Sequence, residues 1–94
     1  ETVYHKIFEA VEKVPGASNP HRVRSRQIGN TYMIVLDIEA DGNITLTEAH
    51  KIADEVEKSI KQSIESVYDI VVHIEPKGKH HSEEKFGVNK KMLK

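Results

Sequence analysis

The stretch from Tyr68 to Glu75 constrains the fold of this chain more than any other segment. Side chains along a β-strand point alternately to opposite faces, so its pattern predicts a strand with two unlike faces. One face carries only aliphatic residues, Ile70, Val72 and Ile74. The other carries Val71, His73 and Glu75. An imidazole and a carboxylate one pleat apart on the same face make half of a site for a divalent metal ion.

Two segments have the periodicity of helices. Residues 2–14 place apolar side chains at helical spacing, and Pro15 ends that helix because proline disfavours the α conformation of the residue before it. Thr45 begins a second helix, with Glu48 three residues on to complete a capping box. Five apolar residues form the stripe that this helix is predicted to bury: Leu46, Ala49, Ala53, Val56 and Ile60.

Two more strands are predicted in the first half of the chain, over 21–28 and 31–39. The Gly29-Asn30 pair between them is typical of a hairpin turn, because glycine accepts a positive φ. The second and third strands, joined by a helix, should be parallel with a right-handed crossover. The order helix, strand, strand, helix, strand therefore predicts an open α+β sandwich, with a three-stranded mixed sheet and two helices on one face.

This topology brings several potential ligands together, because the carboxyl ends of parallel strands meet at one edge of the sheet. Five side chains from distant parts of the sequence converge on this edge: His21, Asp37, His50, His73 and Glu75. A strict two-residue hairpin pairs Arg22 with Asp37 and would turn His21 toward the core, opposite Ile38. Because His21 follows Pro20 at a loop junction, geometry alone leaves its orientation open.

Size and composition exclude several classes of protein. The 94 residues make one domain, and the absence of cysteine excludes a disulfide scaffold, a thiolate zinc finger and a thiol nucleophile. The net charge of −1 argues against a nucleic-acid partner. Because the sequence has no Gly-rich phosphate loop and no nucleophile beside a base, we do not expect an enzyme. The first residue, Glu1, with no signal-like segment after it, leads us to expect a piece of a larger protein.

Three other patterns have competing interpretations. Residues 37–48 match the spacing of an EF-hand calcium loop, but an EF-hand needs an entering helix, and the residues before Asp37 alternate as in a strand. A basic row, Arg22, Arg24 and Arg26, lacks the interleaved aromatic residues of an RNA-binding sheet and favours a solvated edge strand. The charged residues 77–94 predict a flexible tail, in which His80-His81 could bind metal only loosely.

The mixed face of the predicted sheet also carries exposed apolar residues, namely Met33, Val35 and Val71. Because the helices cover only the other face, these residues suggest a partner that covers this one. We expect an isologous homodimer through this face.

Four motifs resemble those of the cytoplasmic C-terminal domain of cation diffusion facilitator transporters. They lie in the right order over residues 1–76, and the tail has no counterpart. The motifs are Val14-Pro-Gly-Ala-Ser-Asn-Pro-His21, Arg24-Ser-Arg26-Gln-Ile-Gly29, Ala49-His50 through Ala53-Asp54-Glu-Val-Glu57, and Asp69-Ile-Val-Val-His73-Ile-Glu-Pro76. The resemblance implies a metallochaperone-like (ferredoxin-like) fold in the cytosol, below a six-helix membrane domain. It also implies a homodimer that binds Zn²⁺, which draws the protomers together and favours transport.

The resemblance further implies a ligand set. The family's metal-binding histidine after the Pro-Gly loop corresponds to His21, and its helix ligand corresponds to His50. The pair on the last strand corresponds to His73 and Glu75. The position at the end of the second strand is often His in relatives and is Asp37 here. With Asp37 in place of a histidine, this ligand set has more oxygen donors than the His-rich sets of relatives, so Mn²⁺ and Fe²⁺ become alternatives to Zn²⁺.

We therefore expect residues 1–76 to form a regulatory domain of a zinc or other divalent-cation efflux transporter, which senses cytosolic metal and gates transport by dimerising. A stand-alone metal carrier or a small-molecule-sensing α/β module is the alternative. A calcium module that uses residues 37–48 is a weaker one. The first expectation places the chain, itself soluble, on the cytoplasmic side of a membrane and in one polypeptide with a transmembrane domain.

Overall fold

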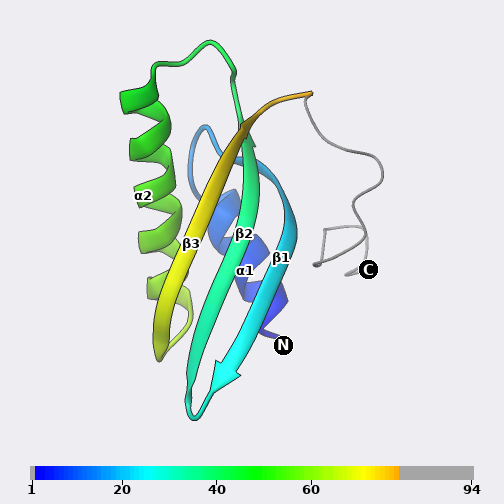
Figure 1. The fold of residues 1–94 in the computed structure, drawn as a ribbon, viewed down its shortest axis with the longest axis vertical. Coiled ribbons are helices and arrows are strands. Elements are labelled where there is room, and N and C mark those ends of the chain that lie inside the picture. Colours follow the sequence, from blue (N-terminus) through cyan, green and yellow to red (C-terminus); the bar gives the residue numbers. More distant parts are fainter. Residues whose placement is uncertain (1, 79–94) are drawn as a thin grey trace.

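The structure, a computed structural model, describes residues 2–78, so the expected tail and His80-His81 lie outside the described residues. The elements follow the expected order of helix, strand, strand, helix and strand (Figure 1). They are α1 (Val3–Glu12), β1 (Ser18–Ile28), β2 (Thr31–Ala40), α2 (Leu46–Ser63) and β3 (Val67–Pro76). The strands are longer by a few residues than their sequence pattern predicts, chiefly because β1 begins before His21.

The sheet has the order β1-β2-β3, with β2 in the centre. β1 pairs with β2 antiparallel through the hairpin, and Gly29 takes a φ of 61° in the turn, as the Gly-Asn pair predicts. β2 pairs with β3 parallel, which confirms the mixed sheet. In Figure 1 the strands face the viewer, α1 lies behind them and α2 runs beside β3.

The hydrophobic core lies between the sheet and the two helices. Alternate residues of β2, Ile34, Leu36 and Ile38, are fully buried on this side of the sheet. α1 contributes Ile7 and Val11, and α2 contributes Val56 and Ile60, all with no exposed surface. Each such side chain stabilises the fold by about 1.5–3 kcal/mol relative to an exposed position.

The first turn of α2 is capped but lies outside the core, whereas later turns contribute buried side chains to it. Thr45 and Glu48 form the predicted capping box, in which each side chain accepts the backbone N–H of the other residue. The prediction that Leu46 is buried is wrong, because 87% of its surface is exposed. A groove separates the first turn of α2 from β3, so the buried stripe of the helix is deepest farther along, at Val56 and Ile60.

Two irregularities in β1 decide which way its first residues point. The β1–β2 register shifts between Ser18 and His21 and again between His21 and Arg24. Asn19 and Arg22 take positive φ angles of 48° and 49° at these places, as bulged residues do. His21 is consequently paired with Asp37 and not with Ile38, so the strict hairpin register is wrong for this part of the strand.

Candidate metal centre

Polar side chains gather on the face of the sheet that the helices do not cover. In the parallel β2–β3 ladder, Asp37 is paired with His73, and Glu39 is paired with Glu75. Paired residues of neighbouring strands point to the same face, so these four side chains form two adjacent rows. The bulges of β1 add His21 to the same face, opposite Asp37.

Within residues 2–78, three potential ligands lie close enough together to hold one metal ion: His21, Glu39 and Glu75. One ligand atom from each residue lies within 4.8 Å of the other two. Glu39 is 7% exposed, and the side chain of His21 is 12% exposed, so the group is largely withdrawn from water. Sequence reasoning considered Glu39 only as part of a calcium loop. Its position two residues after Asp37, on the same face of the same strand, is the signal that could have found it.

The orientation of the His21 ring suits a metal ligand. Its Nδ1 lies 2.8 Å from the backbone oxygen of Asn19, and Nδ1–H is the donor because a carbonyl oxygen only accepts. In the neutral ring, Nε2 is then the nitrogen with a lone pair, and it lies 3.1 Å from Oε1 of Glu75. A backbone carbonyl that holds one ring nitrogen so that the other faces the metal is a common arrangement in metal sites.

The surroundings of His21 raise its pKa above the ordinary value of 6.5. Burial of the ring disfavours the charged form and by itself lowers the pKa. The hydrogen bond to the Asn19 carbonyl and the attraction of Glu75 and Asp37 outweigh it. Without a metal ion, His21 therefore keeps its proton up to a higher pH than an unperturbed imidazole does.

Asp37 lies next to this group with both carboxylate oxygens engaged. Nη1 of Arg22 donates to Oδ2 at 3.2 Å, and Nδ1 of His73 lies 3.3 Å from Oδ1. The Asp37 side chain is only 2% exposed, whereas that of His73 is 62% exposed. The cluster thus has a buried part near β1 and β2 and an open part on β3.

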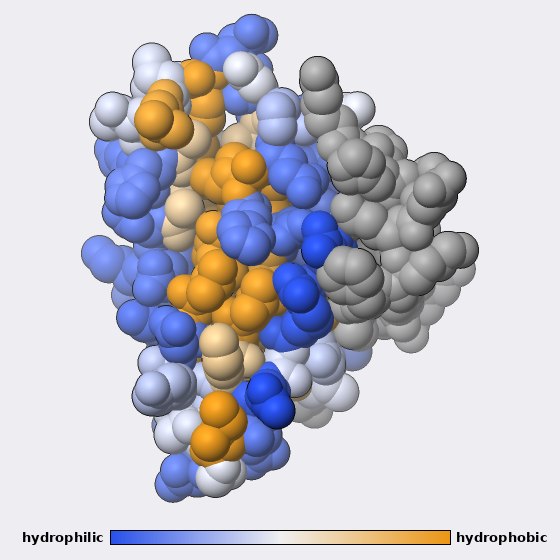
Figure 2. Space-filling model, viewed as in Figure 1, coloured by the Kyte–Doolittle hydropathy of each residue, from blue (hydrophilic) through white to orange (hydrophobic). Residues whose placement is uncertain are grey.

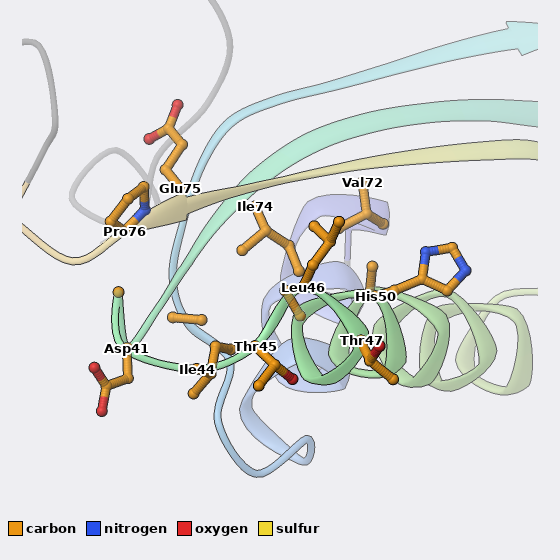
Figure 3. A pocket seen from close by; sticks show the side chains of 14 residues that line it. Asp41, Ile44, Thr45, Leu46, Thr47, His50, Val72, Ile74, Glu75 and Pro76 are labelled. Carbon is orange, nitrogen blue, oxygen red and sulfur yellow. The ribbon is translucent and has the colours of Figure 1, made fainter.

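His50 is placed apart from this group. It lies on α2, its side chain is 78% exposed, and its Nε2 is 3.6 Å from Oδ2 of Asp54, one turn along the helix. His50 and Glu75 both line the groove of about 760 Å³ between α2 and the end of β3. Figure 3 shows the Glu75 carboxylate pointing away from α2, whereas the His50 ring extends from that helix.

The donor set fits a small divalent cation. Zn–N and Zn–O bonds of about 2.0–2.2 Å place tetrahedral ligand atoms about 3.4 Å apart. Ligand atoms within 4.8 Å of one another need only small side-chain movements to reach this spacing. One imidazole nitrogen and two carboxylate oxygens suit Zn²⁺, and also Mn²⁺ or Fe²⁺.

The calcium-loop interpretation lacks its structural context. An EF-hand loop follows a helix, but Asp37 and Glu39 are inside β2. Asp41 accepts a hydrogen bond from the backbone N–H of Asn43, and Glu48 is engaged in the helix cap.

Among residues 2–78, no helix is long and apolar enough to cross a membrane.

Comparison with known proteins places the chain in a family. The family model described as the cytoplasmic domain of cation efflux proteins matches residues 1–77. The cation-efflux pump FieF of Salmonella typhimurium (strain LT2) is 37% identical over 71 residues. That alignment covers 76% of this chain and 23% of the pump, so the chain spans about a quarter of the length of the curated relatives it matches.

Two solved structures share the fold. The metal-bound C-terminal domain of the CzcD transporter from Thermotoga maritima superimposes with a TM-score of 0.79 and 35% identity, covering 84% of this chain and 92% of that domain. A variant of the MamM CTD in a cadmium form gives a TM-score of 0.77 and 29% identity, covering 81% and 95%. These matches confirm the metallochaperone-like α+β fold. The chain belongs to the cation efflux (cation diffusion facilitator) family and corresponds to its cytoplasmic domain.

Proposed function

We propose that this domain binds a divalent cation, Zn²⁺ first of all, on the helix-free face of its sheet and so regulates the efflux transporter of which it is a part. The observation that carries the proposal is the convergence of His21, Glu39 and Glu75 from three different strands. Support comes from the relatives, since a CzcD domain is described as metal-bound and a MamM CTD variant was solved in a cadmium form.

In this proposal each residue has a separate task. His21 supplies Nε2, and Glu39 and Glu75 supply carboxylate oxygens, with Asp37 and His73 as the neighbouring donors. The bound cation supplies positive charge where carboxylates are crowded together. Zn²⁺ is preferred over Mn²⁺ and Fe²⁺ because it stands above both in the usual order of affinity for nitrogen and oxygen ligands.

Titration calorimetry with Zn²⁺ tests the site. We expect His21→Ala to weaken binding at least tenfold, because it removes the one imidazole of the buried group. His73→Ala measures what the open part of the cluster adds. His5→Ala is the matched control, since His5 is an exposed residue of α1 outside the group. Equal affinity in wild type and His21→Ala would overturn the ligand assignment.

The regulatory step is proposed to act on a dimer. Met33, Val35 and Val71 lie on the face with the cluster and are partly exposed, and Val35 is paired with Val71 across β2 and β3. Figure 2 shows apolar side chains gathered along the middle of the face that carries the strands, with polar side chains on both flanks. We call Met33, Val35 and Val71 the strip. A second copy of the domain that packs on this strip would place two clusters near each other. Each protomer has a core that is complete without metal, so the cation would change the arrangement of the dimer and not the fold.

Two measurements test the dimer. Analytical ultracentrifugation should show association that depends on concentration, and Val35→Glu should abolish it by placing a charge in the strip. Ile28→Glu, at an exposed position outside the strip, is the control. Small-angle scattering should show a more compact dimer with zinc. Only monomer at high concentration, or identical scattering profiles with and without saturating zinc, would overturn this step.

A further inference from the structure

Arg22 has an unusual place beside the proposed metal site. It directly follows His21 in β1, and its φ of 49° marks it as a bulged residue. The bulge turns both side chains to the helix-free face, where His21 reaches Glu75 and Arg22 reaches Asp37. Neighbouring residues of one strand thus serve the two parts of the cluster.

The Arg22–Asp37 pair is well suited to persist. The Asp37 side chain is 2% exposed, and a buried carboxylate is costly unless a positive group stays close to it. An arginine guanidinium carries a permanent positive charge and so suits this role. The guanidinium lies 3.2 Å from Oδ2 of Asp37 and can leave it only if the Arg22 side chain moves away. That movement would leave the buried carboxylate without this positive partner.

Asp37 is also the residue that a second metal ion would need. Its other oxygen, Oδ1, lies 3.3 Å from Nδ1 of His73, so Asp37 and His73 together offer an oxygen and a nitrogen donor beside the first group. The guanidinium donates to the other oxygen of Asp37, Oδ2, and so holds a positive charge fixed to the protein beside this pair. A divalent cation at the same place would be repelled by it.

We infer that Arg22 is a tethered cation that occupies Asp37 and limits the cluster to one metal ion per chain, held by His21, Glu39 and Glu75. The inference rests on the proposed function. Arg22 then determines metal stoichiometry without being a ligand itself. A chain without this guanidinium carries two metal ions, the second held by Asp37 and His73.

Counting bound zinc tests the inference. Purified domain is dialysed against zinc in excess, and zinc per chain is measured by elemental analysis. Wild type should carry one zinc ion and Arg22→Gln should carry two. Arg26→Gln, which removes the same charge from the same strand opposite Met33, should carry one. Asp37→Asn added to Arg22→Gln should return the count to one.

The outcomes separate the two proposals. One zinc ion in both wild type and Arg22→Gln would overturn the role of Arg22 and leave the site standing. Two in wild type would also overturn it. No zinc in wild type would overturn the proposed site and the role of Arg22 together. Circular dichroism checks that each variant folds. If Arg22→Gln does not fold, Arg22→Gly takes its place, because glycine adopts a φ of 49° without strain. Arg22→Gly should also carry two zinc ions.

Discussion

Glu39 and Glu75 are partners across the parallel β2–β3 ladder, and one oxygen of each lies within 4.8 Å of the other. Two carboxylates held this close on a largely buried surface repel each other when both are charged. A cation between them removes that repulsion, and this relationship underlies the first prediction.

Zinc should stabilise the folded domain. Free zinc at 100 times its dissociation constant adds about 2.7 kcal/mol to the free energy of unfolding. For a domain of this size the melting temperature then rises by on the order of 10 °C. Circular dichroism melting of wild type, Glu39→Gln and the exposed control Glu65→Gln measures this, and only Glu39→Gln should lose most of the rise. An unchanged melting temperature of the wild type with zinc, or an equal rise in Glu39→Gln, would contradict the prediction.

Zinc affinity should decline with acidification from a pH above 6.5. The pKa of His21 is raised above that value, and a ligating imidazole must be neutral, so protons compete with zinc below the raised pKa. Calorimetry at several pH values and NMR titration of the ring measure both quantities. Glu75→Gln should lower the pKa of His21, because Glu75 contributes to raising it.

The metal-free domain should show the opposite dependence on pH. A histidine whose pKa is higher in the folded than in the unfolded state stabilises the fold fully below about pH 6.5, and this contribution is lost as the pH rises through the folded pKa. Chemical denaturation across this window, with His21→Gln as the reference, isolates the contribution. A pKa of His21 at or below 6.5 would refute both pH predictions.

Two leucines should respond differently to truncation. Leu36→Ala should cost about 2–5 kcal/mol of unfolding free energy, because Leu36 has no exposed surface and its loss leaves a cavity. Leu46→Ala should change stability by less than about 0.5 kcal/mol, because Leu46 is 87% exposed. Urea denaturation compares them directly, and similar losses would contradict the placement of Leu46 outside the core.

The helix cap offers a similar comparison. Thr45→Ala should cost about 1 kcal/mol, because the Thr45 hydroxyl accepts the backbone N–H of Glu48. Thr47→Ala removes the same side chain from an exposed position inside the helix and should cost little or nothing. If thermal melting finds Thr47→Ala as damaging as Thr45→Ala, the cap does not stabilise α2 as described.

Local sequence signals predicted most of the fold. The Gly29-Asn30 turn, the Thr45 cap and the alternation in β3 each depend on residues a few positions apart, and all three are seen in the structure. The rule that strands joined by a helix run parallel then determined the sheet.

The details of the site could not be predicted in the same way. The orientation of His21 depends on two bulges that place non-glycine residues, Asn19 and Arg22, at positive φ. The residue types at these two positions are not enough to predict both bulges. Glu39 joins the group because of a register across two strands that are far apart in sequence. The engagement of Asp37 by Arg22 follows from the same bulge.

The hairpin joins β1 to β2 at Gly29-Asn30, whereas the cluster lies at the opposite end of the same two strands. No backbone turn links the strands there, and β3 ends nearby as the other edge of the sheet. A cation bound by one side chain from each strand would therefore cross-link the three strands at this end, as the turn joins β1 and β2 at the other end. Backbone amides of β1 and β3 near the bound ion would then exchange with solvent more slowly, since neither edge strand could separate without first releasing the ion.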